Sequence, residues 1–252
     1  MNQDGGFYDS ARMDVQRLVR QIDTELRAHG TPARAEHEKG YLKSTRVHYG
    51  TSVPAIRSIA KAVGLQHPRI EHDDLVATVR ALWSMPAHED RMVAVELLEV
   101  YADRLEAVDI ALVEQMLRES GTWALVDGLA ASVAGRLFEQ HSELGEVLDR
   151  WSVDDDFWIR RSALLALLVP LRRGDGDFER FGRYADAMLH EKEFFIRKAI
   201  GWVLRDTARK RPAMVFDWLL PRAGRASGVT MREAVKPLSD QQREAILCQT
   251  AQ

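Results

Sequence analysis

The sequence has a single cysteine, Cys248, and no apolar run that approaches the roughly 20 residues of a membrane-spanning helix. One thiol cannot form an internal disulfide or a Cys-x-x-Cys motif, which favours a reducing compartment. The polar, acidic N-terminus has neither the basic nor the apolar region of a signal peptide. We therefore expect a cytoplasmic protein that makes no membrane contact.

Glycine and proline are also scarce, with 16 and 8 residues, while 46% of the chain is hydrophobic and 29% is charged. This composition excludes a disordered, collagen-like or loop-rich all-β protein. Apolar residues recur at helical spacing almost throughout, and no stretch of period-two alternation is long enough for a sheet. The sequence thus predicts an all-α fold.

Start and stop signals divide this pattern into helices of ordinary length. Ser239 with Gln242 forms a capping-box signature, and Pro54 sits where a first-turn proline is tolerated. The predicted helices are Asp14–Arg27, Pro54–Val63, Asp73–Trp83, Glu89–Tyr101, Ala107–Glu119, Trp123–Gln140, Ser142–Arg150, Asp155–Leu171, Phe178–Leu189, Phe194–Lys210, Ala213–Leu219, Thr230–Val235 and Asp240–Leu247.

The chain also repeats itself. Residues 157–163 align with residues 194–200 at an offset of 37, residues 230–235 continue the series at a further 35, and Thr122-Trp123 precedes Phe157-Trp158 by 35. Chance recurrence of common helical residues would not be expected to give three consistent offsets. Each period holds two helices, as in a HEAT-like unit, and such pairs stack because neither buries its apolar face alone. We expect a tail over residues 1–12 and one domain over 13–252, a curved solenoid whose concave face suits a rod-shaped partner.

Charge is divided unevenly along the chain, although the net value is only −3. Residues 157–236 carry 17 lysines and arginines against 9 acidic residues, whereas residues 1–156 carry 17 against 27. A basic C-terminal half on an acidic protein is typical of a one-sided polyanion footprint. Ordinary solvated surfaces can produce the same asymmetry.

One predicted helix concentrates the basic residues on a single stripe. Lys198, Trp202, Arg205 and Arg209 recur at i, i+4, i+7 and i+11, and Ile196, Ile200, Val203 and Leu204 face elsewhere. Like charges on one stripe repel, and an anionic partner would offset that repulsion. The alternative is a solvated face on which arginine side chains cover a half-buried Trp202.

A carboxylate lies within another predicted helix, where aspartate has a poor propensity. Trp123 and Asp127 share one face of that helix, and Leu125 and Val126 point toward packing positions. One repeat later, Trp158 and Arg161 form a similar i, i+3 pair. Stacking should bring Asp127 close to Arg161, with Trp123 and Trp202 beside them. A structural salt bridge between repeats would explain the Asp127–Arg161 pair equally well.

These residues resemble a known family. The Trp-x-x-x-Asp pattern at 123–127, Phe-Trp-Ile-Arg-Arg at 157–161 and especially the long motif at 192–205, KEFFIRKAIGWVLR, look like the AlkD family of alkylpurine DNA glycosylases. The similarity extends from about Ala35 to Lys236. It passes through Gly40-Tyr41-Leu42-Lys43 and Pro54-x-x-Arg57, and it leaves out the first dozen residues and the loop 172–177.

The resemblance implies a catalytic cleft formed by Trp123, Asp127, Arg161 and Trp202. It also implies DNA or substrate contacts from Tyr41, Lys43, Arg57, Trp158, Arg160, Lys198, Arg205 and Arg209. An N3- or N7-alkylated purine is already cationic and leaves without protonation, so a carboxylate that stabilises the developing sugar cation is the main requirement. The tryptophans would present electron-rich faces to the cationic nucleoside.

The resemblance further implies a lesion that need not be drawn into a deep pocket, which admits bulky adducts. No lysine has a clear activating environment for a Schiff base, so we expect base excision without strand cleavage. The expected partner is double-stranded DNA with alkylated purines, at the bacterial nucleoid. We expect a monomer and no cofactor.

The chief alternative is a non-catalytic HEAT-like protein that binds DNA or acts as a scaffold. A helix-interior Asp127 between two tryptophans argues against it, and a pure protein scaffold would not explain the basic stripe. The eight histidines, including His37, His48, His72, His88, His141 and His190, show no HExxH grouping. We therefore expect no metal site and surface positions for these histidines.

Overall fold

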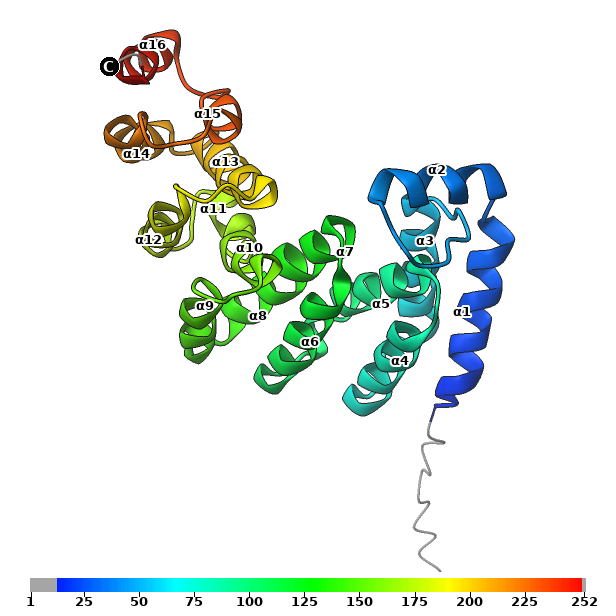
Figure 1. Ribbon diagram of the computed structural model, residues 1–252. Helices are drawn as coiled ribbons and strands as arrows, with labels where there is room; N and C mark the ends of the chain where they lie inside the picture. The colour runs from blue at the N-terminus through cyan, green and yellow to red at the C-terminus, as the bar shows by residue number, and fades with distance from the viewer. Residues whose placement is uncertain (1–12, 251–252) are drawn as a thin grey trace, which may run out of the picture. The chain divides into compact units, whose positions relative to one another are not determined.

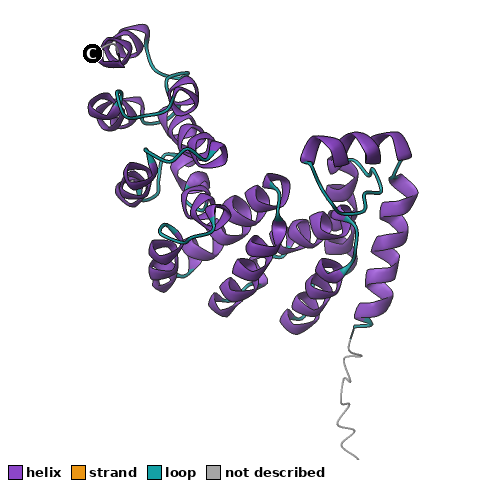
Figure 2. Ribbon diagram, in the orientation of Figure 1, coloured by secondary structure: helices purple, strands orange, loops and turns teal. Residues whose placement is uncertain are grey.

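The computed structural model describes residues 13–250, and their regular secondary structure is helical (Figures 1 and 2). The all-α prediction is confirmed. The chain divides into two compact units, Met1–Arg104 and Leu105–Gln252. The expected tail over residues 1–12 lies outside the described residues, and the assignment of residues 13–252 to one domain stays a prediction. None of the helices described is both long and apolar enough to cross a membrane.

The first unit consists of helices joined by short connections. They are α1 (Val15–His29), α2 (Pro32–Leu42), α3 (Val53–Gln66), α4 (His72–Ser84) and α5 (His88–Val100), followed by a 3-10 turn at Ala102–Arg104. Helix α5 contacts α3 and α4, and α1 contacts α3 and α4. The core is formed by apolar residues at helical spacing, such as Leu75, Val79 and Leu82 of α4, all fully buried.

Helix α2 is the element that the sequence did not predict. It carries no buried residue, and its polar and apolar side chains are not segregated to opposite faces. Apolar periodicity is the main sequence signal of a helix, so a helix that buries none of its residues gives almost none. Pro32 in the first turn is the one local start signal that was available.

Backbone contacts hold the connection between α2 and α3. The Thr31 N–H donates to the Gly50 carbonyl, and a Cβ at Gly50 would lie 2.2 Å from the Thr31 carbonyl oxygen. Gly50 also has a φ of +77°, a region that favours glycine. The Glu89 side chain from α5 accepts hydrogen bonds from the backbone N–H groups of Tyr49, Gly50 and Thr51. The returning segment is thereby fixed against α5.

The second unit contains the repeats. Its α-helices are α6 (Ile110–Ser120), α7 (Trp123–Gly128), α8 (Gly135–Gln140), α9 (Gly145–Trp151), α10 (Phe157–Leu165), α11 (Leu168–Arg173), α12 (Phe178–Met188), α13 (Phe194–Ala208), α14 (Pro212–Leu219), α15 (Gly228–Ala234) and α16 (Asp240–Thr250). The 3-10 turns are Ala107–Asp109, Ser142–Leu144 and Leu220–Arg222, and residues Leu129–Ala134 form a π-helical segment between α7 and α8.

Within this unit the second helices of successive pairs contact one another. Helix α10 packs against α7 and α13, and α13 packs against α15. Helices α9, α12 and α14, which come first in their pairs, lie along one side of this row (Figure 1). The predicted stacking of helix pairs is confirmed for the second unit, and so is the burial of Leu125, Val126, Ile196, Ile200, Val203 and Leu204. The expected concave surface stays a prediction.

Two predicted helices differ in detail from the structure. The expected helix Asp155–Leu171 is broken between Leu165 and Leu168, which gives α10 and α11. Pro170 has no N–H to donate to the Ala166 carbonyl, and its ring would clash with that carbonyl in a continuous helix. The expected helix Trp123–Gln140 is continuous but contains the π segment. At the C-terminal end the capping box is confirmed, because Ser239 and Gln242 exchange hydrogen bonds.

Helices α13 and α15 approach each other closely at Gly201. A Cβ at this position would lie 2.9 Å from the Glu233 Cβ and 2.9 Å from the Thr230 carbonyl oxygen. The Thr230 hydroxyl donates to the Arg197 carbonyl, which joins the same two helices. A glycine is therefore required on α13 for this packing distance.

Glu233 is the centre of an ion-pair cluster on α15. Its carboxylate pairs with Lys198 at 3.4 Å, with Lys236 at 3.1 Å and with Arg205. Burial raises the pKa of Glu233, but the three cations outweigh that effect and bring the pKa down to about 2. The ionised carboxylate thus links α15 to α13.

We predict that Gly201→Ala lowers the free energy of unfolding by about 1–3 kcal/mol, because the added methyl overpacks α13 against α15. Gly40→Ala is the matched control, since nothing lies within 4 Å of a Cβ there. That change should raise stability by about 0.5–1 kcal/mol, as alanine replaces glycine in an exposed helix. Guanidinium chloride unfolding measures both. A Gly201→Ala variant as stable as the wild type would contradict the close approach.

We predict that Glu233→Gln destabilises the protein at pH 7, and that the difference from the wild type shrinks as the pH falls from 4.5 toward 2. A carboxylate whose pKa is lower in the folded state than its ordinary 4.5 adds stability above that ordinary value. This stability is lost as the pH falls through the folded value. Urea unfolding at several pH values tests this, with the exposed Glu244→Gln as control. A difference independent of pH would contradict it.

Candidate active site

Asp127 on α7 and Arg161 on α10 form a two-point ion pair in the second unit. The Arg161 Nε donates to Asp127 Oδ1 at 2.9 Å, and Nη2 donates to Oδ2 at 2.9 Å. The Arg161 side chain is 3% exposed and that of Asp127 is 18% exposed. The prediction that stacking brings these two residues together is confirmed. The Asp127 side chain is therefore partly accessible to solvent while its partner is buried.

The electrostatic state of Asp127 reflects two opposing effects. Burial raises the pKa of Asp127 above its ordinary value, while the hydrogen bonds and the charge of Arg161 act in the other direction. Both carboxylate oxygens accept from one planar guanidinium, which fixes the orientation of the carboxylate plane. This is a pre-oriented negative charge at a half-buried position.

Arg161 is itself held by α13. Its Nη1 donates to the Phe195 carbonyl, and its guanidinium carbon lies 5.8 Å from the centroid of the Phe195 ring. The helix ends are set by capping residues, because Asp156 accepts from the Trp158 N–H at the start of α10 and Glu193 accepts from the Phe195 N–H at the start of α13. The second helices of three successive pairs, α7, α10 and α13, therefore meet at Arg161.

Aromatic side chains gather beside Arg161. The rings of Trp158 and Phe195 are 4.8 Å apart between centroids, and Phe157 stands 4.5 Å from Trp158. Phe194 extends the cluster and is 53% exposed. Trp123, at the first position of α7, shares the helical face of Asp127 one turn away. Electron-rich rings are thus present next to the pair.

Trp202 lies on α13 two turns after Phe195 and is half-buried. Its indole N–H donates to Asp206 Oδ2 at 3.1 Å, and the same carboxylate accepts from Arg172 at 2.8 Å. These contacts restrain the indole ring. That Trp123 and Trp202 flank the pair stays a prediction.

The predicted basic stripe on α13 is largely neutralised within the protein. Arg205 pairs with Glu233 and with Asp206, and Lys198 pairs with Glu233. The Lys198 side chain remains 44% exposed against 25% for Arg205, and Arg209 is exposed. Asp206 and Glu233 therefore offset the repulsion between like charges on the stripe, and an external anion would offset it further. Of the stripe, Lys198 and Arg209 are the cations that reach solvent most.

Arg160, also expected to contact DNA, is engaged inside the protein. It makes a two-point ion pair with Glu191 at 3.0 and 2.8 Å and donates to the backbone carbonyls of Asp154 and Asp155. These contacts join the start of α10 to the segment before α13. Its side chain is only 19% exposed.

The remaining predicted residues belong to the first unit. Tyr41, on α2, is 66% exposed, and its ring stacks on His37 with centroids 6.5 Å apart. Lys43 ends that helix in the left-handed region with a φ of 50° and is exposed. Arg57, on α3, is 66% exposed and pairs with Glu96 at 3.0 Å. All three present side chains to solvent.

Three residues of this region were not singled out from the sequence: Phe195, Asp206 and Glu233. The repeat alignment contained a signal for Phe195, which occupies the position of Trp158 at the offset of 37. Asp206 follows Arg172 by 34 residues and Glu233 follows Lys198 by 35, close to the spacing of Asp127 and Arg161, so the repeat offset also contained a signal for these two carboxylates. The charge imbalance of residues 157–236 accordingly overstated the cations that face solvent.

Comparison with known proteins shows which family and which solved structures this chain resembles. The family model described as DNA alkylation repair enzyme matches residues 22–238. A search of curated proteins finds no match. A solved structure described as a predicted DNA alkylation repair enzyme from Enterococcus faecalis has a TM-score of 0.75 and 22% identity, over 84% of this chain and 98% of that one.

A second solved structure, AlkD2 from Streptococcus mutans, has a TM-score of 0.55 and 14% identity, over 89% of this chain and 99% of that one. At such identities the likeness of both structures concerns the fold alone, and it confirms the predicted HEAT-like class. The match of the family model extends over both units and confirms the resemblance first noticed at residues 123–127, 157–161 and 192–205. The chain therefore belongs to the DNA alkylation repair enzyme family.

Proposed function

We propose that the protein is a monofunctional DNA glycosylase that hydrolyses the N-glycosidic bond of N3- or N7-alkylated purines in duplex DNA, bulky adducts included. The observation that carries the proposal is the Asp127 carboxylate, which Arg161 holds by two hydrogen bonds while the Asp127 side chain stays partly accessible to solvent. Membership of the DNA alkylation repair enzyme family supports DNA as the substrate.

The chemistry requires little from a proton donor. Alkylation at N3 or N7 leaves a positive charge on the purine, and cleavage of the bond between C1′ and N9 returns its electron pair to the base, which departs neutral. The sugar carries the charge as an oxocarbenium-like cation. Water then adds to C1′ and loses a proton, which yields an abasic site and the free base.

Asp127 is suited to the cationic stage. A pre-oriented carboxylate in a partly buried environment stabilises a nearby positive charge more strongly than one in water does, because it does not reorganise. Arg161 fixes the carboxylate plane and favours its ionised form. The same group can orient the attacking water. Asp127 and Arg161 thus take the roles of charge stabiliser and positioning residue.

The aromatic side chains would receive the cationic nucleoside. In this proposal, Trp123 and Trp202 contact the cationic nucleoside beside Asp127. Trp158 lies within the aromatic cluster beside Arg161. A cation over an aromatic face gains about 0.5–2 kcal/mol, depending on how far it is desolvated. This preference favours an alkylated base over a neutral one.

The DNA backbone would be held by exposed cations rather than by the internally paired ones. Lys198 and Arg209 present their charges to solvent, and Tyr41, Lys43 and Arg57 are exposed in the first unit. Arg160 and Arg205, which are engaged with carboxylates, are better suited to positioning helices α10 and α13. Any phosphate contact they make would require exchange of those partners.

The second candidate is a non-catalytic DNA-binding protein, in which the Asp127–Arg161 pair only joins repeats. The bidentate geometry favours this alternative to the extent that both oxygens of Asp127 already have a partner. The two candidate functions predict different results for one measurement, the release of the base from alkylated DNA, so an experiment can separate them.

We predict that the wild type releases 7-methylguanine or 3-methyladenine from alkylated duplex DNA without cutting the strand. Asp127→Asn should lower the single-turnover rate by at least about 100-fold, the usual size of a lost electrostatic contact in a transition state. DNA affinity should stay within about twofold. Base release is measured by chromatography and affinity by fluorescence anisotropy.

Asp186→Asn is the matched control for Asp127→Asn. Asp186 also joins two elements through an arginine, because its carboxylate on α12 pairs with Arg222 of the 3-10 turn Leu220–Arg222 at 3.2 Å, but it lies outside the row of α7, α10, α13 and α15. Its substitution should leave base release unchanged. Binding without release from methylated or bulky-adduct DNA by the wild type would instead establish the non-catalytic alternative.

We predict that Lys198→Ala and Arg209→Ala each weaken binding to undamaged duplex DNA and lower the slope of log K against log salt by about 1. Each lost phosphate contact releases one counterion fewer. Lys210→Ala is a control at an exposed lysine that lies off the stripe. Salt-dependent anisotropy measures the slopes. If the stripe variants and Lys210→Ala behaved alike, α13 would not be the DNA-binding helix.

A further inference from the structure

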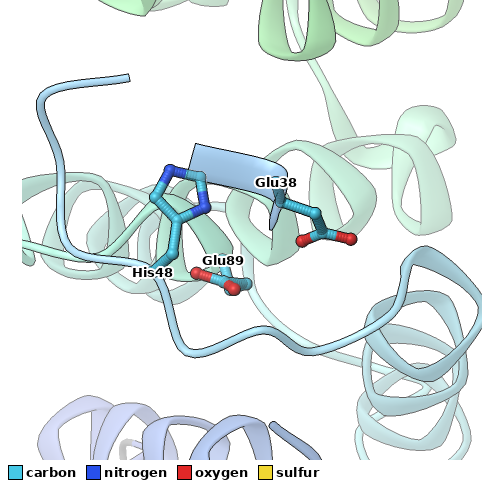
Figure 3. A group of neighbouring side chains, drawn as sticks. All are labelled: Glu38, His48 and Glu89. Carbon is cyan, nitrogen blue, oxygen red and sulfur yellow. The ribbon is translucent and has the colours of Figure 1, made fainter. Parts of the chain in front are cut away.

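Three side chains in the first unit lie close together (Figure 3). They are Glu38 of α2, His48 of the segment that follows it, and Glu89 of α5. One ring nitrogen of His48 and one carboxylate oxygen from each glutamate lie within 4.8 Å of one another. Three separate elements thus direct metal-binding atoms toward one point.

Glu89 is the best-placed member of this cluster. It is 1% exposed, and its Oε1 accepts from the backbone N–H groups of Gly50 at 2.6 Å, Tyr49 at 3.0 Å and Thr51 at 3.3 Å. Its Oε2 is buried and has no hydrogen-bond partner in the protein. A buried carboxylate oxygen without a partner is costly, and a bound cation would remove that cost.

His48 has the same deficiency, because both of its ring nitrogens are buried without a partner. Its ring stacks on that of His88 with centroids 4.8 Å apart. The backbone N–H of His88 donates to the Val47 carbonyl at 2.9 Å. The expected surface position is wrong for His88, which is 4% exposed, since this stacking buries it. Burial lowers the pKa of His48, which favours the neutral imidazole that binds metals.

We propose that Glu38, His48 and Glu89 bind one divalent transition-metal ion, with zinc as the first candidate. One imidazole nitrogen and two carboxylate oxygens are ligands that zinc accepts, and a water would complete four-coordination. Atoms bonded to one tetrahedral zinc at about 2.1 Å lie about 3.4 Å apart, so side-chain rotations that draw the three ligand atoms closer together would close the site. Glu38 accepts from Arg34 through Oε1 and can bind through its other oxygen.

The site would supply what packing does not give to α2. That helix has no buried residue, so apolar burial contributes little to its position. A metal bound by Glu38 and Glu89 would tie α2 to α5 directly. Tyr41 lies three residues after Glu38, on the same side of α2, so the ion would also fix the base of this exposed side chain.

Zinc binding to the metal-free full-length chain tests the proposal. All proteins carry Cys248→Ser, so that the exposed thiol cannot contribute. Calorimetry should show one zinc ion per chain, and saturation should raise the melting temperature. His48→Gln should weaken binding by at least about tenfold, a loss that even the outer partner of a metal ligand can cause. The exposed His190→Gln should bind as the parent protein does.

A second pair keeps the test independent of folding. Glu38→Gln should weaken zinc binding, while Glu36→Gln, an exposed glutamate on the same helix, should not. Circular dichroism confirms that both are folded; Glu89→Gln is avoided because Glu89 also holds backbone N–H groups. Absence of saturable binding, or equal affinity in His48→Gln and His190→Gln, would overturn the proposal. Neither result depends on base release, so the proposed glycosylase activity is tested separately.

Discussion

Stacking at a nearly constant repeat length is the constraint on which the second unit depends. Each helix pair buries its apolar face only against its neighbours, so side chains one repeat apart become contacts. Ion pairs follow this spacing, with separations of 34 residues for Arg161 and Asp127, 34 for Arg172 and Asp206, and 35 for Lys198 and Glu233. The repeat length therefore determines which charges meet.

The proposed active site is a consequence of this packing rather than an addition to it. Asp127 and Arg161 lie on the second helices of successive pairs, α7 and α10, and α13 completes the site through the Phe195 carbonyl. A pair that joins repeats also holds a carboxylate in one orientation, which is what stabilisation of a sugar cation requires. Structural and chemical roles coincide at Asp127, so only a variant that preserves shape, such as asparagine, can separate them.

In the first unit, helix α2 is held by contacts of a different kind. No apolar face anchors this helix, and its position depends on polar contacts around Gly50, Glu89 and His48. Such contacts are directional and leave buried atoms that need partners. The proposed metal ion would be the partner of one His48 nitrogen and of the second Glu89 oxygen. The exposed Tyr41 would then stand on a helix fixed by coordination chemistry.

The sequence alone determined the features that depend on spacing: the helical class, the buried faces of α7 and α13, the capping box at Ser239 and the meeting of Asp127 with Arg161. Periodicity is local, and one repeat offset extends it to the next helix. Only the tertiary structure decided that α2 is a helix, that Arg160 and Arg205 pair internally, and that Glu38, His48 and Glu89 converge. The pairs of Arg160 with Glu191 and of Arg205 with Glu233 span 31 and 28 residues, which are not repeat lengths, and the segments that carry Glu38, His48 and Glu89 share no period. No spacing in the sequence therefore predicts them.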